Sequence, residues 1–212
     1  LGGNPTMQPL AEFFPSVGGC RPVSAAAIAP RLRAAMVEQR PQLTRFIQSA
    51  TVQTNETARG ICWLLPVLYP VWPTIHLVDL GCSAGLNLVA DQRHYRLQNQ
   101  DVPADGLCIG LGPPEQFVLP WTGPFERPPL STIPQPLSRI GCDLHPFLLA
   151  DTHDELTLMS FVWGDQVHRL DMLRQAMTAL NEVTNSDAPV RLFRTDLPHD
   201  LPCFLAQHRH SI

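Results

Sequence analysis

The sequence predicts an α/β protein in which a helical N-terminal region precedes a parallel β-sheet. Three observations lead to this fold class. Residues 1–73 carry apolar side chains at helical spacing. A short and nearly continuous apolar run follows at 75–80, and shorter runs that include polar residues follow at 138–143 and 190–193; the first is typical of a buried strand in a parallel sheet, and the other two are candidate strands. Helical patterns separate the last two runs, as a crossover between parallel strands requires.

The N-terminal region is expected to form a first domain over residues 1–73. Residues 1–23 are rich in glycine and proline, which predicts a docked arm without regular structure. Ser24 is a candidate N-cap for the helix expected next. The apolar spacing predicts three helices, over 25–38, 41–47 and 54–68.

The second domain is expected to span residues 74–212, starting with the strand at 75–80. A glycine-containing turn and an apolar helix follow this strand, and then a polar stretch at 92–101. Residues 103–136 hold 9 of the 22 prolines; because proline confines strands to sheet edges, we expect a Pro-rich insertion there with a hairpin-like excursion. The remaining elements are expected at 138–143 (strand), 156–162 and 165–180 (helices) and 190–193 (strand).

The composition excludes several classes of protein. With 44% hydrophobic residues, the 212-residue chain can bury a sizeable core. All 15 basic residues counted as Lys or Arg are arginines, whereas Walker A loops, protein kinases and pyridoxal phosphate enzymes each require a lysine. The net charge of −4 lacks the basic excess that a general nucleic-acid-binding protein needs.

Cysteine spacing and hydropathy predict a cytoplasmic protein. The six cysteines contain no C-x-x-C pair, so the pattern indicates neither a zinc site nor a disulfide framework, and we expect no metal. The longest apolar run, 61–72, is interrupted by two prolines and is shorter than the roughly 20 residues that cross a bilayer. No signal peptide is visible ahead of it. The start at Leu1 leads us to expect a fragment of a longer protein.

The densest motif of the chain is Asp79-Leu80-Gly81-Cys82-Ser83-Ala84-Gly85-Leu86-Asn87. A strand that ends in glycines and turns sharply into a helix brings backbone N–H groups close to a ligand. Gly81 and Gly85 allow the close approach because they carry no side chain. A plain strand-to-helix turn is the alternative interpretation of this motif.

This motif resembles the first motif of the class I S-adenosylmethionine-dependent methyltransferases, and the resemblance extends over about residues 74–200. It implies a Rossmann-like sheet and S-adenosylmethionine as the cofactor. Gly81, Ser83 and Gly85, with Asp79 and Asn87 nearby, would then hold the methionine end of the cofactor. Ile140-Gly141-Cys142-Asp143 resembles the second strand end, where Asp143 would bind the ribose. Arg194-Thr195-Asp196-Leu197-Pro198 resembles the third, where Asp196 would contact the adenine.

Two features depart from the methyltransferase pattern. Ser83 replaces the usual central glycine, and Asp143 lies 58 positions after Gly85, where about 20 are typical of such nucleotide folds. The Pro-rich insertion would supply the difference. No residue is assigned as a catalytic base, and the resemblance identifies no methyl acceptor.

A further resemblance connects the chain with a bacterial family of proteins of unknown function. It rests on Gln53-Thr54-Asn55-Glu56, on 81–87, on Gly141-Cys142-Asp143-Leu144-His145-Pro146 and on Phe161-Val162-Trp163. It implies that 53–56 lies near the ligand cleft. The alternative is a polar helix start with Thr54 as its N-cap.

Two alternatives to a methyltransferase remain open. Gly81-Cys82-Ser83-Ala84-Gly85 also satisfies G-x-S-x-G, the nucleophile elbow of serine hydrolases. Such an enzyme requires an upstream oxyanion loop, which is absent, and a separate acid and histidine, whereas Asp196 and His199 are close neighbours. The other alternative is a non-catalytic scaffold with the same fold.

The number of predicted strands indicates an incomplete sheet. Only 16 residues follow Asp196, and one βαβ unit takes about 30. We therefore expect the exposed edge of the 75–80 strand to be covered by the N-terminal helices, by a second copy of the chain, or by residues outside this sequence.

Overall fold

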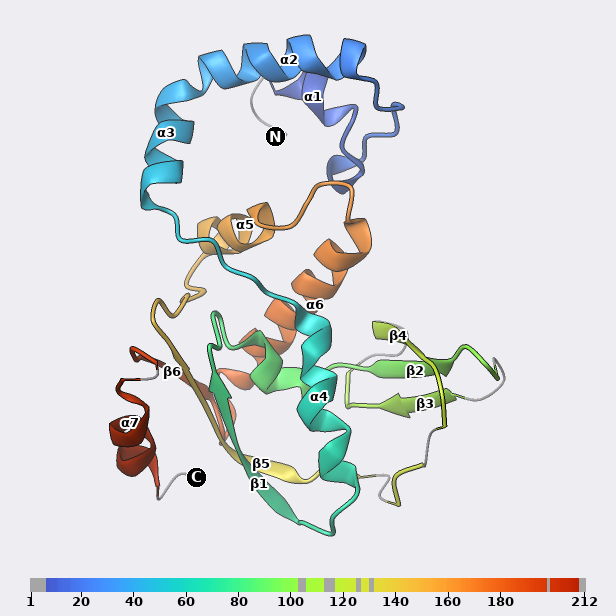
Figure 1. Ribbon diagram of the computed structural model, residues 1–212, viewed down its shortest axis with the longest axis vertical. Helices are drawn as coiled ribbons and strands as arrows, with labels where there is room; N and C mark the ends of the chain where they lie inside the picture. The colour runs from blue at the N-terminus through green and yellow to red at the C-terminus, as the bar shows by residue number, and fades with distance from the viewer. Residues whose placement is uncertain are drawn as a thin grey trace. The chain divides into compact units, whose positions relative to one another are not determined.

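The computed structural model describes residues 7–102, 106–112, 117–124, 127–129, 132–197 and 199–209, so parts of the expected Pro-rich insertion lie outside the described residues. The chain divides into two compact units (Figure 1). The first unit consists of Leu1–Val52 with Met159–Leu170. The second unit consists of Gln53–Leu158 with Asp171–Ile212.

The first unit is helical. Its elements are α1 (Gln8–Ala11), the 3-10 helix η1 (Pro15–Val17), α2 (Ala25–Glu38) and α3 (Arg40–Ser49). The prediction of α2 is confirmed, and the Ser24 hydroxyl accepts a hydrogen bond from the Ala27 amide at 3.3 Å as its N-cap. The prediction of an arm without regular structure is wrong, because prolines in the first turns of α1 and η1 favour helix starts.

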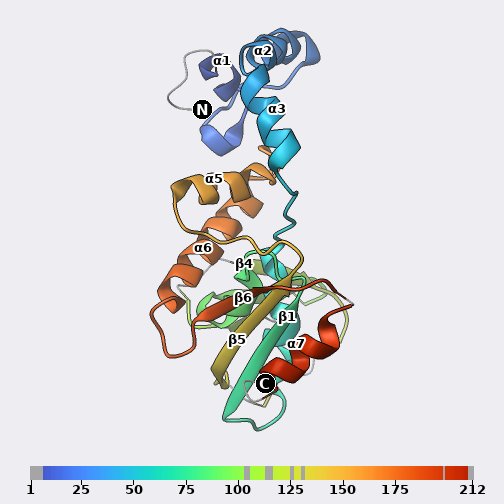
Figure 2. The same cartoon turned by 90° about the vertical axis from the view of Figure 1, so that its left-hand side faces the viewer.

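The second unit contains the predicted parallel sheet. Its strands are β1 (Thr74–Leu80), β5 (Gln135–Asp143) and β6 (Val190–Arg194), in the order β1-β5-β6 (Figure 2). These strands confirm a mixed α/β fold with a three-stranded parallel sheet. Among the described residues, β1 pairs with β5 on one edge and with no strand on the other.

Helices cover both faces of this sheet. On one face, Phe204 of α7 (Leu201–His208) packs against Ile140 and Cys142 of β5. On the other face, Val89 of the 3-10 helix η4 (Leu86–Gln92) packs against α6 (Val167–Val183). The chain reaches α6 from β5 through α5 (Thr152–Ser160). Both faces of the sheet are thus covered in part, as is usual for a parallel sheet.

The prediction of a hairpin is wrong, because the structure forms a second three-stranded sheet instead. Its strands are β2 (Tyr95–Asn99), β3 (Gly106–Ile109) and β4 (Phe117–Trp121). The two strands within the Pro-rich insertion, β3 and β4, do not pair with each other as a hairpin would; β3 pairs antiparallel and β4 parallel with β2. The sequence placed β2 in a polar stretch, but its side chains alternate, with Tyr95 and Leu97 buried and Arg96 exposed.

Two predicted helices are shorter and more irregular than expected. The segment predicted as one helix at 54–68 forms η2 (Thr57–Gly60), α4 (Ile61–Leu64) and η3 (Pro66–Leu68). Pro66 lacks the N–H that a continuous helix would require at its position. Instead of an α-helix after β1 the chain forms η4, a 3-10 helix kinked at Val89. None of the described helices combines the length and apolar character that spanning a membrane would require.

Candidate functional site

The candidate site lies at the carboxyl edge of the β1-β5-β6 sheet, where β1 ends at Leu80, β5 at Asp143 and β6 at Arg194. Open α/β sheets bind their ligands at this edge. All parts of the site belong to the second unit.

The turn after β1 depends on left-handed backbone conformations. Gly81 has φ +82°, Ser83 φ +52° and Gly85 φ +71°. A Cβ atom at Gly85 would also lie 2.9 Å from Leu192 Cδ2. Glycine is therefore required at Gly85, and Ser83 holds a conformation that glycine would adopt more easily.

Asp143 fixes this turn to β5. The Ser83 amide donates to Asp143 Oδ2 at 2.8 Å, and the His145 amide donates to Oδ1 at 2.9 Å. The backbone carbonyl of Asp143 accepts from the Thr195 amide at 2.8 Å, which ties the loop after β6 to the same point. Two of the strand ends identified in the sequence are thus joined directly through Ser83 and Asp143.

Residues 53–55 complete the cluster around Ser83. The Ser83 hydroxyl donates to Gln53 Oε1 at 2.5 Å and accepts from Asn55 Nδ2 at 3.2 Å. Gln53 Nε2 in turn donates to the His145 carbonyl at 3.2 Å. The helix that follows begins at Thr57 and has no side-chain cap, so the interpretation of Thr54 as an N-cap is wrong. The cluster instead places this segment at the carboxyl edge of the sheet, beside the turn after β1.

Asn87 has a positioning role. Its Nδ2 donates to the Glu56 carbonyl at 3.4 Å, and its own carbonyl accepts from Trp63 Nε1 at 2.7 Å. Its side-chain Oδ1 is buried without a hydrogen-bond partner among the described residues. Asn87 therefore connects η4 to the segment that contacts Ser83.

Two carboxylates lie on one face of the sheet at this edge. Asp79 is in register with Gly141, and Asp143 follows Gly141 by two positions, so both side chains project to the same face. Burial raises the pKa of Asp79, and the negative charge of Asp143 raises this pKa further. No cation among the described residues pairs with either carboxylate. The arrangement therefore favours a positively charged ligand.

The backbone amides of the turn are mostly occupied. Gly81 and Cys82 both donate to the Cys142 carbonyl, at 2.8 and 3.1 Å, and Gly85 donates to the Cys82 carbonyl at 2.8 Å. With the Ser83 amide bonded to Asp143, four amides of the turn already have acceptors. Phosphate-binding turns leave such amides free for the ligand, so this turn is unsuited to a pyrophosphate.

Asp196 lies apart from the hydrogen-bonded cluster. It follows β6 and is exposed. Its backbone amide donates to Asp200 Oδ2 at 3.3 Å and not to a residue of the cluster. The structure thus brings Asp79, Ser83 and Asp143 together and places Asp196 on the neighbouring loop. Pro198, in the same sequence pattern, lies outside the described residues.

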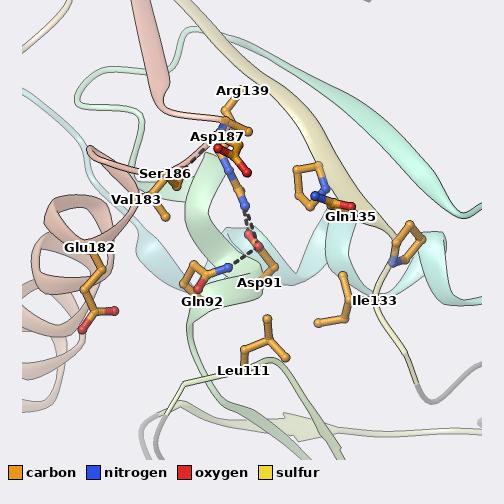
Figure 3. A pocket seen from close by; sticks show the side chains of 13 residues that line it. Asp91, Gln92, Leu111, Ile133, Gln135, Arg139, Glu182, Val183, Ser186 and Asp187 are labelled. Carbon is orange, nitrogen blue, oxygen red and sulfur yellow. Dashed lines mark hydrogen bonds and ion pairs between the residues drawn. The ribbon is translucent and has the colours of Figure 1, made fainter.

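A separate cavity of about 340 Å³ lies at the opposite edge of the sheet, near the start of β5 (Figure 3). Its buried charges are Asp91 and Arg139, which pair with each other through Nη1–Oδ1 at 2.6 Å and Nη2–Oδ2 at 2.5 Å. Because these charges neutralise one another, they offer little net charge to a ligand. No local pattern indicates this pair, because its members are 48 positions apart.

We expect Ser83 not to react with a fluorophosphonate probe. Its side chain is buried, with the residue 6% exposed, and its hydroxyl is bonded to two amides where a hydrolase would place a histidine. Mass spectrometry of the probe-treated protein should find no adduct at Ser83. Stoichiometric labelling there, lost in Ser83→Ala, would support the serine hydrolase alternative.

Comparison with known proteins identifies a family. The family model described as "Uncharacterized protein conserved in bacteria (DUF2332)" matches residues 4–212. This match confirms the resemblance to a bacterial family of unknown function. No curated protein and no solved structure matches the chain.

Proposed function

We propose that this chain, which belongs to the DUF2332 family of bacterial proteins, binds S-adenosylmethionine at the carboxyl edge of the β1-β5-β6 sheet. The observation that carries the proposal is the pair of carboxylates, Asp79 and Asp143, which share one face of the sheet without a cationic partner among the described residues. S-adenosylmethionine brings a sulfonium and an ammonium group, and either would relieve the repulsion between the two carboxylates.

The sheet order supports this proposal. The order β6-β5-β1 is the 3-2-1 order of the first half of a Rossmann-like sheet. The occupied amides of the turn favour a ligand that is recognised through carboxylates over a dinucleotide that needs free N–H donors. Both features agree with the resemblance of the motif at 79–87 to the methyltransferases.

Each residue would have a distinct role towards the cofactor. Asp143 uses one lone pair of each oxygen for a backbone amide and has others left to accept the ribose hydroxyls. Asp79 would face the positively charged methionine end, and the exposed Asp196 would accept from the adenine amino group. Methyl transfer would be a displacement at the methyl carbon, in which the protein aligns the acceptor with the sulfonium.

Calorimetric titration with S-adenosylmethionine tests the proposal. We expect a micromolar dissociation constant, and ligand at 100 times that value should stabilise the fold by about 2.7 kcal/mol. Asp143→Ala should weaken binding by about 1–3 kcal/mol, because the ribose hydroxyls lose a charged acceptor. Asp187→Ala, at an exposed acid near the amino edge of the same sheet, is the matched control and should bind like the wild type.

The pH dependence of binding provides a second readout in the same titration. Because the pKa of Asp79 is raised above its ordinary value, this carboxylate becomes neutral at a higher pH than a free aspartate. Affinity for the sulfonium should therefore fall as the pH is lowered towards the Asp79 pKa, and Asp79→Asn should lose this component of the pH dependence. Wild-type protein that gives neither heat nor a shift in melting temperature at millimolar ligand would refute the proposal.

A further inference from the structure

A second cavity, of about 480 Å³, lies in the second unit, and its walls come from the segment η2–α4–η3 and from the strands β2 and β4. This volume falls within the range of roughly 300–1,000 Å³ that small-molecule sites occupy. The wall of the cavity is predominantly apolar, and its principal side chains are Ala58, Ile61, Leu65, Leu97, Leu119 and Trp121.

The cavity lies beside the hydrophobic core that α4 forms with the second sheet. Between α4 and the second sheet, Leu64, Tyr95 and Phe117 are fully buried and fill the interface. Further along β4, Leu119 and Trp121 are only partly buried and line the cavity. An apolar ligand there would remove this surface from water, which is favourable in proportion to the area covered.

The charged groups at the cavity restrict the ligand further. Arg59 lines the cavity and is exposed, and its side chain has no hydrogen-bond or ion-pair partner among the described residues. A guanidinium presents paired donors that match a carboxylate. Glu56, the other charged residue of the wall, does have partners, and its negative charge disfavours a ligand with several anionic groups.

We propose that this cavity binds a small amphipathic monocarboxylate. The apolar body of the ligand lies between α4 and the β2–β4 strands, and its carboxylate pairs with Arg59 at the rim. The site differs from the one at the carboxyl edge of the other sheet in both position and charge preference, because that edge favours a cation and this rim favours an anion. Binding here does not depend on the S-adenosylmethionine proposal.

Three compounds with the same apolar body test this proposal. 4-Phenylbutyrate, 4-phenylbutanol and 4-phenylbutylamine are titrated into the full chain and followed by calorimetry and by ligand-observed saturation-transfer NMR. We expect the carboxylate to bind most tightly and the amine most weakly. Because an ion pair at a solvent-exposed rim contributes modestly, Arg59→Gln should weaken carboxylate binding by about threefold to tenfold and leave alcohol binding unchanged.

Two further variants control for charge and for position. Arg96→Gln removes an exposed arginine from the opposite face of β2 and should leave all three affinities unchanged. Ala58→Leu fills the cavity from the η2 wall and should weaken the carboxylate and the alcohol alike; Leu119→Phe fills it from β4 if the first variant does not fold. The proposal is overturned if the carboxylate does not bind at millimolar concentration, if the alcohol binds equally well, or if a folded cavity-filling variant binds like the wild type.

Discussion

Asp91→Ala is expected to lower the free energy of unfolding by about 3–5 kcal/mol, the cost of removing one partner of a buried ion pair. The side chains of Arg139 and Asp91 are 4% and 2% exposed and pair through both terminal guanidinium nitrogens, Nη1 and Nη2 (Figure 3). Alanine at position 91 would leave the Arg139 guanidinium charged and unpaired in the interior. Arg139 also donates to the Leu88 carbonyl, so the loss would loosen η4 against β5. Urea denaturation measures the change.

An exposed ion pair of similar length provides the control. Arg174 and Asp171 lie 2.9 Å apart, with side chains 46% and 53% exposed. Asp171→Ala should therefore change the free energy of unfolding by less than about 1 kcal/mol, since water screens this pair. The double variant Asp91→Leu/Arg139→Met should recover much of the lost stability, because neither buried charge remains. Equal losses for Asp91→Ala and Asp171→Ala would contradict the account of the buried pair.

Leu64→Ala is expected to lower the free energy of unfolding by about 2–5 kcal/mol. Leu64 is fully buried in the core that joins α4 to the second sheet, against side chains that include Tyr95 and Phe117. Truncation removes apolar contacts and leaves a cavity that tightly packed neighbours fill only in part.

Denaturation of Leu64→Ala beside Val71→Ala checks this value. Val71 is 83% exposed, so its truncation should change stability by no more than about 0.5 kcal/mol. A loss at Leu64 no larger than that at Val71 would show that α4 does not pack against the second sheet as described.

Strand β1 was predictable from the sequence because Ile75 to Leu80 form a nearly continuous apolar run that ends at a glycine turn. Such a run is typical of a strand in a parallel sheet and is visible without knowledge of distant residues. Helix α2 was predictable for a similar reason, since its N-cap Ser24 acts on the neighbouring turn.

The second sheet was not predictable because its stability depends on pairing between distant segments. β2 has only five residues, and its two inward side chains, Tyr95 and Leu97, are separated by the polar Arg96. This pattern is too short to distinguish from a polar loop. Strand β4 pairs in parallel with β2 although β3 lies between them in the sequence. No local pattern indicates this pairing.

The candidate site could be predicted only in part from the sequence. The motif around Ser83 and the acid at Asp143 stand at recognisable strand ends, and the structure joins them through one hydrogen bond. The contacts from Gln53 and Asn55 to Ser83 span 30 and 28 residues. Only the resemblance of 53–56 to a known family placed this segment near the cleft, because amide side chains have no periodic pattern that reveals their partners.

Amide chemical shifts of the ¹⁵N-labelled protein, recorded as S-adenosylmethionine is added, test the central claim most directly. The account predicts saturable shifts at the carboxyl edge of the sheet, at the amides of Gly81, Ser83 and Thr195. It predicts no comparable shifts at the amino edge, at Arg139 or Asp187. Absence of any shift at millimolar ligand, or shifts confined to the amino-edge cavity, would contradict the claim that this edge of the sheet is the binding site.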